Sequence, residues 1–242
     1  MTHAWNRLEY IVGKPGLAAL AAASVVVCGL GGVGGHAVEA LVRSGIGRLI
    51  LVDYDRVTLT NLNRQLAALH STLGRRKVDV IAQRARDINP QCDVRTHAVS
   101  VSRDNAASLI ASDASYVVDA IDSVEAKVDL ITHCREIQVP IVVSMGAGNK
   151  VDPSKLRVSD ISETHTCPLA RAVRLQLRRR QIERNVKVVF STEPAVANHV
   201  PADADRRTPG STAFVPPAVG LLLASVVVND ILNAGVTASG SF

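Results

Sequence analysis

The sequence of 242 residues is poor in aromatic side chains, has no paired cysteines and contains no long uninterrupted apolar segment. Aromatic residues make up only 3% of the chain, whereas hydrophobic residues as a whole make up 47%. A core of this composition must be built from Val, Ile, Leu and Ala, which favours buried parallel strands over an antiparallel sandwich. The length is sufficient for one large α/β domain.

The cysteines of the chain are isolated from one another. Cys28, Cys92, Cys134 and Cys167 occur singly, without a C-x-x-C pair or another spacing typical of metal ligands. This pattern argues against a disulfide framework and against a zinc ribbon. No structural zinc is therefore expected.

Two apolar stretches resemble targeting or membrane segments, but neither has the required form. Residues 16–38 are interrupted by glycines and continue directly into a nucleotide-loop pattern. The run from Ala218 to Val228 is too short to cross a bilayer and is typical of a buried helix. We therefore expect a cytoplasmic protein that does not associate with membranes.

Apolar runs alternate with helical patterns over the first 148 residues. Strands are expected at Ser24 to Cys28, Arg48 to Val52, Asp93 to Ala98, Ser115 to Ile121 and Pro140 to Ser144. Helices are expected near Val33 to Ser44, Lys77 to Asn89, Asn105 to Ser112 and Glu125 to Gln138. This alternation is typical of right-handed βαβ units and predicts a Rossmann-like α/β fold, with a mostly parallel sheet flanked by helices.

The pattern changes after Gly148, which predicts a C-terminal extension. A short strand, a basic helix and a second strand are followed by a polar loop and a closing helix that begins with proline. The expected bounds are Leu156 to Val158, Pro168 to Gln181, Lys187 to Phe190, Asn198 to Gly210 and Pro216 to Asn233. The polar loop has little to bury, so we expect it to be mobile.

A glycine-rich motif directly follows the first expected strand. Its glycines, Gly29, Gly31, Gly32 and Gly34, have the G-x-G-x-x-G form with one extra glycine. Such glycines permit a tight turn, a close approach of the backbone to phosphate, and close packing of helix on strand. Asp53 follows the second strand, where an acidic side chain can accept hydrogen bonds from ribose hydroxyls. These features fit NAD, FAD or ATP equally well.

The residues that follow Asp53 favour a triphosphate. Asp55, Asn61 and Gln65 accompany an arginine and a lysine, Arg64 and Lys77. A dinucleotide dehydrogenase does not need these cations there, whereas a triphosphate that loses pyrophosphate does. We interpret Arg64 and Lys77 as a clamp on the β- and γ-phosphates.

The fourth expected strand ends in Asp119-Ala120-Ile121-Asp122-Ser123, which places carboxylates at the edge of the sheet where open α/β folds bind ligands. Asp122 is a candidate ligand for Mg²⁺ between phosphate oxygens. It could also act as the N-cap of the next helix. Asp119 is expected to support the strand end, and Ser123 is a further nucleotide-binding candidate.

The motifs G-L-G-G-V-G, L-V-D-Y-D, N-L-N-R-Q, L-G-x-x-K and D-A-I-D-S together resemble the adenylation domain of the ubiquitin-activating-enzyme-like (ThiF/MoeB/HesA) superfamily. Other motifs, including R-D-I-N-P, F-S-T-E and F-V-P-P, resemble its tRNA threonylcarbamoyladenosine dehydratase branch. The resemblance implies that residues 1–148 form an ATP-binding adenylation region and that residues 149–242 extend the same domain. It also implies ATP-dependent activation of the threonylcarbamoyl carboxylate as an acyl adenylate, followed by cyclisation.

The resemblance has further implications for partners. It implies a tRNA substrate and a homodimer in which Arg7 reaches the triphosphate bound by the partner subunit. A sulfur-relay protein is a possible additional partner. In the dehydratase pattern an acidic residue precedes Pro-Leu-Ala, whereas this chain has Cys167. A lone cysteine without an identifiable base is commonly inert, so Cys167 is not expected to act in catalysis.

The densest positive charge of the chain lies in and after the helix expected from Pro168. Its helical spacing places Arg171, Arg174 and Arg178 on one face and Leu169, Val173 and Leu177 roughly opposite. Arg179, Arg180, Arg184 and Lys187 lie nearby in the sequence. Such a patch can bind RNA phosphates, although a solvated charged face is an equally good reading of composition alone.

Three alternative functions remain open from the residues. Adenylation of the C-terminal glycine of a ubiquitin-like sulfur carrier is the main alternative, although such enzymes usually carry two C-x-x-C pairs. A nucleotide-sensing scaffold would not need Arg64, Lys77 and Asp122 together. An NAD-dependent oxidoreductase ranks last.

Overall fold

Seven strands form one twisted sheet in the order β3-β2-β1-β4-β5-β7-β6. The computed structural model describes residues 3–197, 199 and 209–239, with only the backbone of 235–239. The strands are β1 Ser24–Cys28, β2 Arg48–Val52, β3 Asp93–His97, β4 Tyr116–Asp119, β5 Ile141–Ser144, β6 Leu156–Asp160 and β7 Lys187–Ser191. Six are parallel, and β6 joins antiparallel to β7. The expected α/β class and all the expected strands are confirmed.

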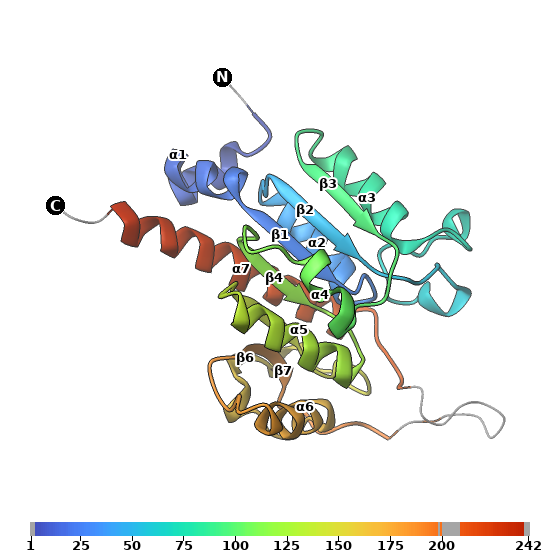
Figure 1. Cartoon of the computed structure of the whole chain (residues 1–242). Helices are drawn as coiled ribbons and strands as arrows, with labels where there is room; N and C mark the ends of the chain where they lie inside the picture. Colours follow the sequence, from blue (N-terminus) through green and yellow to red (C-terminus); the bar gives the residue numbers. More distant parts are fainter. Residues whose placement is uncertain (1–2, 198, 200–208, 240–242) are drawn as a thin grey trace.

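Helices cover both faces of this sheet (Figure 1). They are α1 Asn6–Ala22, α2 Gly34–Arg43, α3 Lys77–Ile88, α4 Arg103–Leu109, α5 Val124–Glu136, α6 Pro168–Arg179 and α7 Val215–Ser239. Helices α1, α2, α3 and α7 share one hydrophobic core with the sheet. Helices α4, α5 and α6 share the other.

The central strands are buried on both faces because parallel strands lie between two helical layers. In β1, Val25 and Val27 belong to the core on the α2 side, whereas Val26 and Cys28 belong to the core on the α5 side. All five residues of β1 are buried. This explains why β1 appears in the sequence as a continuous apolar run rather than as an alternating one.

Helix α1 was not expected from the sequence. Its helical pattern is interrupted in the sequence by Gly13, which has φ 68° in the structure, and by Pro15. These residues kink the helix, in keeping with their poor fit to a regular helix interior. Trp5, just before α1, donates from its indole Nε1 to the Arg43 carbonyl at 2.9 Å. The N-terminal segment is thereby attached near the end of α2.

The closing helix α7 has 25 residues and is longer than the helix expected at Pro216 to Asn233. By length and composition, Val215–Ala234 could cross a membrane. Of the 18-residue apolar stretch within it, 44% is buried inside the protein. The helix packs on α2, β4, β5 and β7. This burial explains its apolar sequence as that of a core helix. The preceding polar segment, Asn198 to Gly210, lies outside the described residues except for 199, 209 and 210.

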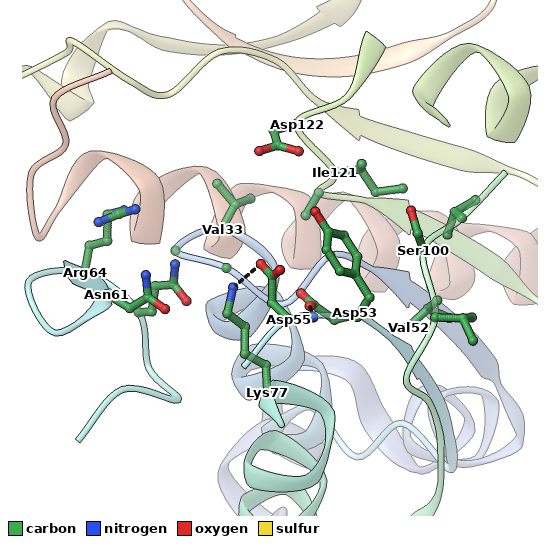
Figure 2. Close-up of a pocket in the computed structure, with 18 residues that line it drawn as sticks. Val33, Val52, Asp53, Asp55, Asn61, Arg64, Lys77, Ser100, Ile121 and Asp122 are labelled. Carbon is green, nitrogen blue, oxygen red and sulfur yellow. Dashed lines mark hydrogen bonds and ion pairs between the residues drawn. The ribbon is translucent and has the colours of Figure 1, made fainter. Parts of the chain in front are cut away.

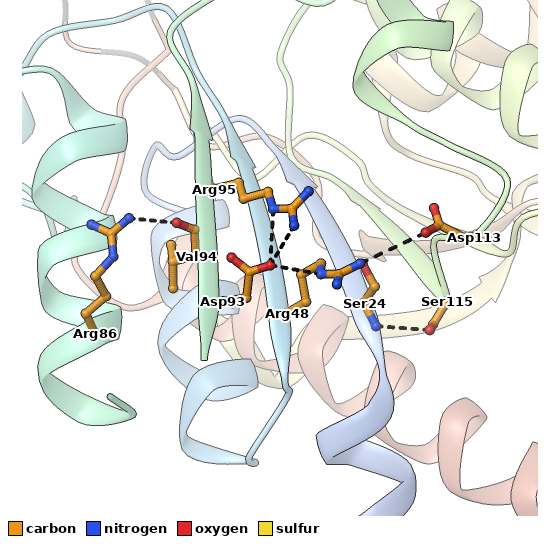
Figure 3. A network of polar contacts seen from close by, with 8 residues as sticks. All are labelled: Ser24, Arg48, Arg86, Asp93, Val94, Arg95, Asp113 and Ser115. Atoms are coloured by element: carbon orange, nitrogen blue, oxygen red, sulfur yellow. Dashed lines mark hydrogen bonds and ion pairs between the residues drawn. The ribbon is translucent and has the colours of Figure 1, made fainter. Parts of the chain in front are cut away.

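At the β3 edge of the sheet, one face carries charged side chains (Figure 3). Asp93 accepts from Arg48 on the neighbouring strand at 3.1 Å and from Arg95 at 3.1 Å. Arg48 also lies 4.0 Å from Asp113. Charged side chains on an edge strand disfavour pairing with another sheet, so this end of the sheet is protected against edge-to-edge association.

The close contact of α7 with α2 depends on Gly220. A Cβ at this position would lie 2.2 Å from the Val33 carbonyl oxygen. We expect Gly220→Ala to separate the two helices and to lower the free energy of unfolding by about 1–3 kcal/mol, the usual cost of overpacking. Urea denaturation will measure the loss, with Ser225→Ala on the exposed side of α7 as control. Equal stability of the two variants would contradict this packing.

Candidate nucleotide site

A pocket of about 350 Å³ opens at the carboxyl ends of β1, β2 and β4 (Figure 2). Strand β1 lies between β2 and β4, so the chain direction of successive crossovers reverses here. Open α/β sheets bind ligands at such a switch point. The pocket is lined by Gly29, Gly31, Gly32, Val33, Val52, Asp53, Tyr54, Asp55, Asn61, Arg64, Gln65, Lys77, Val99, Ser100, Val101, Ala120, Ile121 and Asp122.

The glycine loop forms the floor of the pocket. Gly29 adopts φ 86°, and a Cβ there would lie 2.6 Å from the Ala120 carbonyl oxygen. A Cβ on Gly34 would lie 1.7 Å from the Gly29 carbonyl oxygen. Gly34 therefore permits the close turn into α2, while Gly31 and Gly32 line the pocket. The loop leads into the N-terminus of α2, where an anion is favoured.

Asp53 ties the glycine loop to the end of β2. One of its oxygens accepts from the Leu30 backbone N–H at 2.6 Å, and the other accepts from the Asp55 backbone N–H at 2.7 Å. The residue is buried. Each carboxylate oxygen can accept more than one hydrogen bond. Asp53 thus combines a structural role with the capacity to accept from a ligand hydroxyl.

Lys77 and Asp55 form an ion pair inside the pocket, with 2.7 Å between Nζ and Oδ2. The lysine side chain is only 5% exposed, whereas that of Asp55 is 44% exposed. Figure 2 shows the Lys77 side chain extending toward the Asp55 carboxylate, with the ion pair drawn as a dashed line. A buried lysine at this point can neutralise an anion that enters the pocket.

Arg64, Asn61 and Gln65 come from the loop after β2. Arg64 donates to the Thr60 carbonyl at 3.0 Å and to Asn63 Oδ1 at 2.8 Å, which holds its guanidinium at the rim. Asn61 and Gln65 are buried. Gln65 Oε1 has no hydrogen-bond partner among the described residues. A buried amide oxygen without a partner is costly unless a ligand donates to it.

The loop that carries Asp122 is held by a fully buried ion pair. Lys127 Nζ, on α5, donates to Asp119 Oδ1 at 3.0 Å, and neither side chain has any exposed surface. The same oxygen accepts from the Ile121 backbone N–H at 2.9 Å. Burial raises the pKa of the Asp119 carboxyl, and the charge of Lys127 opposes this shift. Asp119 thus supports the strand end, as expected, and Lys127 is a supporting residue that the motifs did not indicate.

Three expected site residues, Gly34, Ser123 and Arg7, lie outside the pocket lining. Ser123 is the N-cap of α5, where its side chain accepts from the Ala126 backbone N–H at 3.4 Å. The N-cap is therefore Ser123 and not Asp122, whose carboxylate belongs to the pocket. Arg7 lies in α1, which leads into the amino end of β1, opposite the edge that carries the pocket.

One end of the pocket was not anticipated from the sequence. Tyr54, Val99, Ser100, Val101 and Ile121 line it. The segment 99–101 follows β3 and has no motif of its own. Only the sheet order brings β3 next to β2 and so places this segment beside Tyr54. These apolar and aromatic side chains suit a flat ring better than phosphate.

Three carboxylates, those of Asp53, Asp55 and Asp122, line the pocket, but these described residues do not form a cluster of metal ligands. Within the described part of the chain, no three His, Cys, Asp or Glu side chains cluster as potential metal ligands. Asp122 is one carboxylate at the pocket edge. Mg²⁺ commonly binds one or two carboxylates together with substrate phosphates, so this donor fits Mg²⁺ only when phosphate supplies the remaining oxygens.

The arginines of α6 do not all point outward, which corrects the expectation from helical spacing. Arg174 is half-buried and donates to the Thr164 carbonyl at 2.7 Å. Arg180, just after the helix, donates to Asp129 at 2.7 Å. Arg171 and Arg178 are exposed, while Val173 and Leu177 are buried as expected. The exposed positive surface is therefore smaller than the sequence suggests.

The fold is an α/β fold with a pocket at the switch point of its sheet, and the pocket lining includes an arginine, a lysine and carboxylates. The model of the ThiF family matches residues 5–240, and the chain belongs to this family.

Relatives and solved structures extend over most of the chain. The tRNA threonylcarbamoyladenosine dehydratase of Bacillus subtilis (strain 168) is 40% identical over 244 residues, which cover 96% of each protein. The crystal structure of Escherichia coli tRNA N6-threonylcarbamoyladenosine dehydratase in complex with AMP has a TM-score of 0.89 at 35% identity and covers 98% of both chains. Its complex with ATP has a TM-score of 0.88 at 34% identity and covers 99% of both chains.

The buried Lys127–Asp119 pair generates a stability prediction. Among the described residues, Lys127 is the one cation that pairs with Asp119, so Lys127→Met leaves a buried carboxylate without compensation. We expect a loss of about 3–5 kcal/mol in the free energy of unfolding. Guanidinium denaturation will measure it. The double variant Lys127→Met with Asp119→Asn should recover part of the loss, and no recovery would show that the charge interaction is not the cause.

Proposed function

We propose that the chain catalyses the ATP-dependent dehydration of threonylcarbamoyladenosine in tRNA, as its full-length relatives are named for doing. The proposal is carried by one observation above all. A chain that aligns with a dehydratase over 96% of its length places Arg64, Lys77 and Asp122 around one pocket at the sheet's switch point. ATP is the nucleotide, in keeping with the ATP and AMP complexes of the similar E. coli enzyme.

In the proposed binding mode the base lies against Tyr54 and the segment 99–101, and the phosphates lie over the glycine loop. Asp53 accepts from the ribose, with Asn61 and Gln65 contacting the nucleotide from the neighbouring loop. In this binding mode the base occupies the apolar end of the pocket and the phosphates occupy its charged end. Mg²⁺ bound by Asp122 and phosphate oxygens would supply additional positive charge on the triphosphate.

In the proposed reaction the threonylcarbamoyl carboxylate attacks the α-phosphorus of ATP and pyrophosphate leaves, which produces an acyl adenylate. A neighbouring group of the substrate then attacks the activated carbonyl, closes the ring and expels AMP. The carboxylate is ionised at neutral pH, so the first step needs no general base. Arg64 and Lys77 stabilise the charge that develops on the departing pyrophosphate.

The role of Arg7 is proposed to require a second subunit. Trp5, two residues before Arg7, donates to the Arg43 carbonyl at the C-terminal end of α2, so Arg7 lies near the edge of the sheet opposite its own pocket. A strand of five residues spans roughly 17 Å. Arg7 would therefore contact the triphosphate of a partner subunit in a homodimer. A cytoplasmic location and a sulfur-relay partner belong to the same proposal.

The exposed arginines of α6 are proposed to contact tRNA phosphates. Arg171 and Arg178 are free of carboxylate partners within the described residues, unlike Arg180. The helix also begins beside the carboxyl end of β5, since Cys167 faces Gly146 there. It therefore lies on the β5 and β7 side of the nucleotide pocket.

The main alternative is adenylation of the C-terminal glycine of a sulfur-carrier protein. The two C-x-x-C pairs expected for such enzymes are missing from the sequence. Incubation with ATP and either modified tRNA or a sulfur carrier, followed by mass spectrometry of nucleosides and adenylates, separates the two. A carrier adenylate without a cyclised nucleoside would favour the alternative.

Substitutions in the phosphate end of the pocket should affect turnover more than ATP affinity. Arg64→Ala, Lys77→Ala and Asp122→Ala should each lower kcat by on the order of a hundredfold, because each removes a contact to charge that develops in the transition state. Cyclised nucleoside formation will measure this. Cys167→Ser is the control, since the thiol is buried and accepts from the Ala170 backbone N–H. Normal AMP release without cyclised product in that variant would contradict the proposed second step.

Charge reversal on α6 should weaken binding of tRNA. Arg171→Glu with Arg178→Glu should lower tRNA affinity and reduce the dependence of affinity on salt, because phosphate contacts release counterions. ATP binding should not change. Fluorescence anisotropy over a KCl series will measure the slope. Arg180→Ala is a useful comparison, because Arg180 already forms an ion pair with Asp129 and is less available to RNA phosphates. An unaltered slope in the double variant would exclude α6 from the RNA surface.

A further inference from the structure

The two segments that bring Asp55 and Lys77 together form a short antiparallel ribbon, residues 55–57 with residues 75–77. Lys77 N–H donates to the Asp55 carbonyl at 3.0 Å, and Val57 N–H donates to the Arg75 carbonyl at 2.9 Å. These bonds flank the bridge between Arg56 and Arg76. Arg56 and Arg76 are therefore a non-hydrogen-bonded pair, the arrangement in which opposed side chains lie closest, with about 4.5–5.5 Å between Cβ atoms.

The two faces of the ribbon carry different charges. Because successive side chains of an extended chain point to opposite faces, Asp55 and Lys77 share one face and Arg56 and Arg76 share the other. The first pair lines the nucleotide pocket. The second pair does not line it, and both arginines are exposed. The ribbon thus separates a nucleotide-facing surface from a solvent-facing one.

The outward pair holds two positive charges together without a counter-charge. Arg56 donates to the Gly74 carbonyl at 2.8 Å, and no carboxylate among the described residues pairs with Arg56 or Arg76. The nearest acidic side chain along the ribbon, Asp55, is already paired with Lys77. Like charges directly opposite each other are destabilising, so an anion that binds both would relieve the repulsion. Arginine presents a planar fork that matches phosphate.

The position of the pair indicates which phosphate it binds. The ribbon follows β2, on one side of the pocket between β1 and β4, whereas α6 lies on the β5 and β7 side (Figure 1). A nucleic acid strand that delivers a base adduct to the pocket has backbone phosphates on both sides of that base. The phosphates of ATP are approached from the other face of the ribbon, by Lys77.

We propose that Arg56 and Arg76 bind backbone phosphates of the RNA substrate on the β2 side of the nucleotide pocket. This inference rests on the proposed tRNA-modifying function. It adds a second RNA contact, opposite α6, which positions the modified nucleoside between two positively charged surfaces. Phosphate contacts of this kind set the position of a nucleic acid without reading its sequence.

The test compares the double variant, which carries both Arg56→Ala and Arg76→Ala, with the wild-type chain. Affinity for threonylcarbamoyl-modified tRNA should fall about tenfold or more, the size expected when charge-assisted contacts are lost. The slope of log affinity against log salt should fall by about 1–2. The KM for tRNA should rise, while ATP affinity by calorimetry should stay the same. Fluorescence anisotropy over a KCl series measures the first two quantities.

Two further variants isolate the cause. Arg135→Ala is the matched control, because Arg135 is also exposed and also donates to backbone carbonyls, but lies at the C-terminal end of α5, which leads into the amino end of β5 and away from the pocket. It should leave tRNA affinity unchanged. Arg56→Lys with Arg76→Lys keeps the charge and loses the planar fork, so it should preserve most of the salt slope.

Three results would overturn the inference, and one of them concerns the function itself. Unchanged tRNA affinity in the double alanine variant, with weakened binding in the α6 variant, would leave the function intact and exclude the ribbon. Loss of ATP affinity without loss of tRNA affinity would assign the pair to the nucleotide. If the wild-type chain bound no tRNA at any salt concentration, the proposed function would itself be wrong.

Discussion

The pocket depends on one close contact, in which the glycine loop after β1 touches the loop after β4. Only the missing Cβ of Gly29 allows it, since a side chain there would collide with the Ala120 carbonyl. Each loop is then held from its own side. Asp53 binds the glycine loop through the Leu30 N–H, and the buried pair of Lys127 and Asp119 holds the strand end that leads to the second loop. The positions of the glycine loop and of the Asp122 carboxylate in the pocket are therefore set by the same packing.

The charged side chains after β2 lie on opposite faces of one ribbon rather than in a single large patch. The net charge of the chain is a modest +5. The ribbon after β2 places Lys77 in the pocket lining, whereas Arg56 and Arg76 are exposed to solvent. On α6, by contrast, Arg174 is bound to Thr164 and contributes less to the surface than its helical position suggests.

The C-terminal extension is integrated with the central strands through α7. Asp230 on this helix accepts from the Tyr116 hydroxyl at 2.6 Å and from Lys187 at 2.6 Å, which links β4 with β7. Gly220 lets the same helix approach α2 directly behind the glycine loop. The helix that supports the nucleotide loop is thus packed against the last helix of the chain, so the two ends of the sequence contribute to one site.

The βαβ order, the glycine loop and the candidate residues Arg64, Lys77 and Asp122 could be predicted from the sequence, because local periodicity and short motifs are encoded within a few neighbouring positions. The sequence could not reveal α1, whose Gly13 and Pro15 interrupt the helical pattern. Other features became known only from the tertiary structure. These are the set of segments that meet at the pocket, the buried ion pair of Lys127 with Asp119, and the hydrogen bond of Arg174 to the Thr164 carbonyl. The physical reason is that these features depend on sheet order and on burial between distant segments, which no local pattern records.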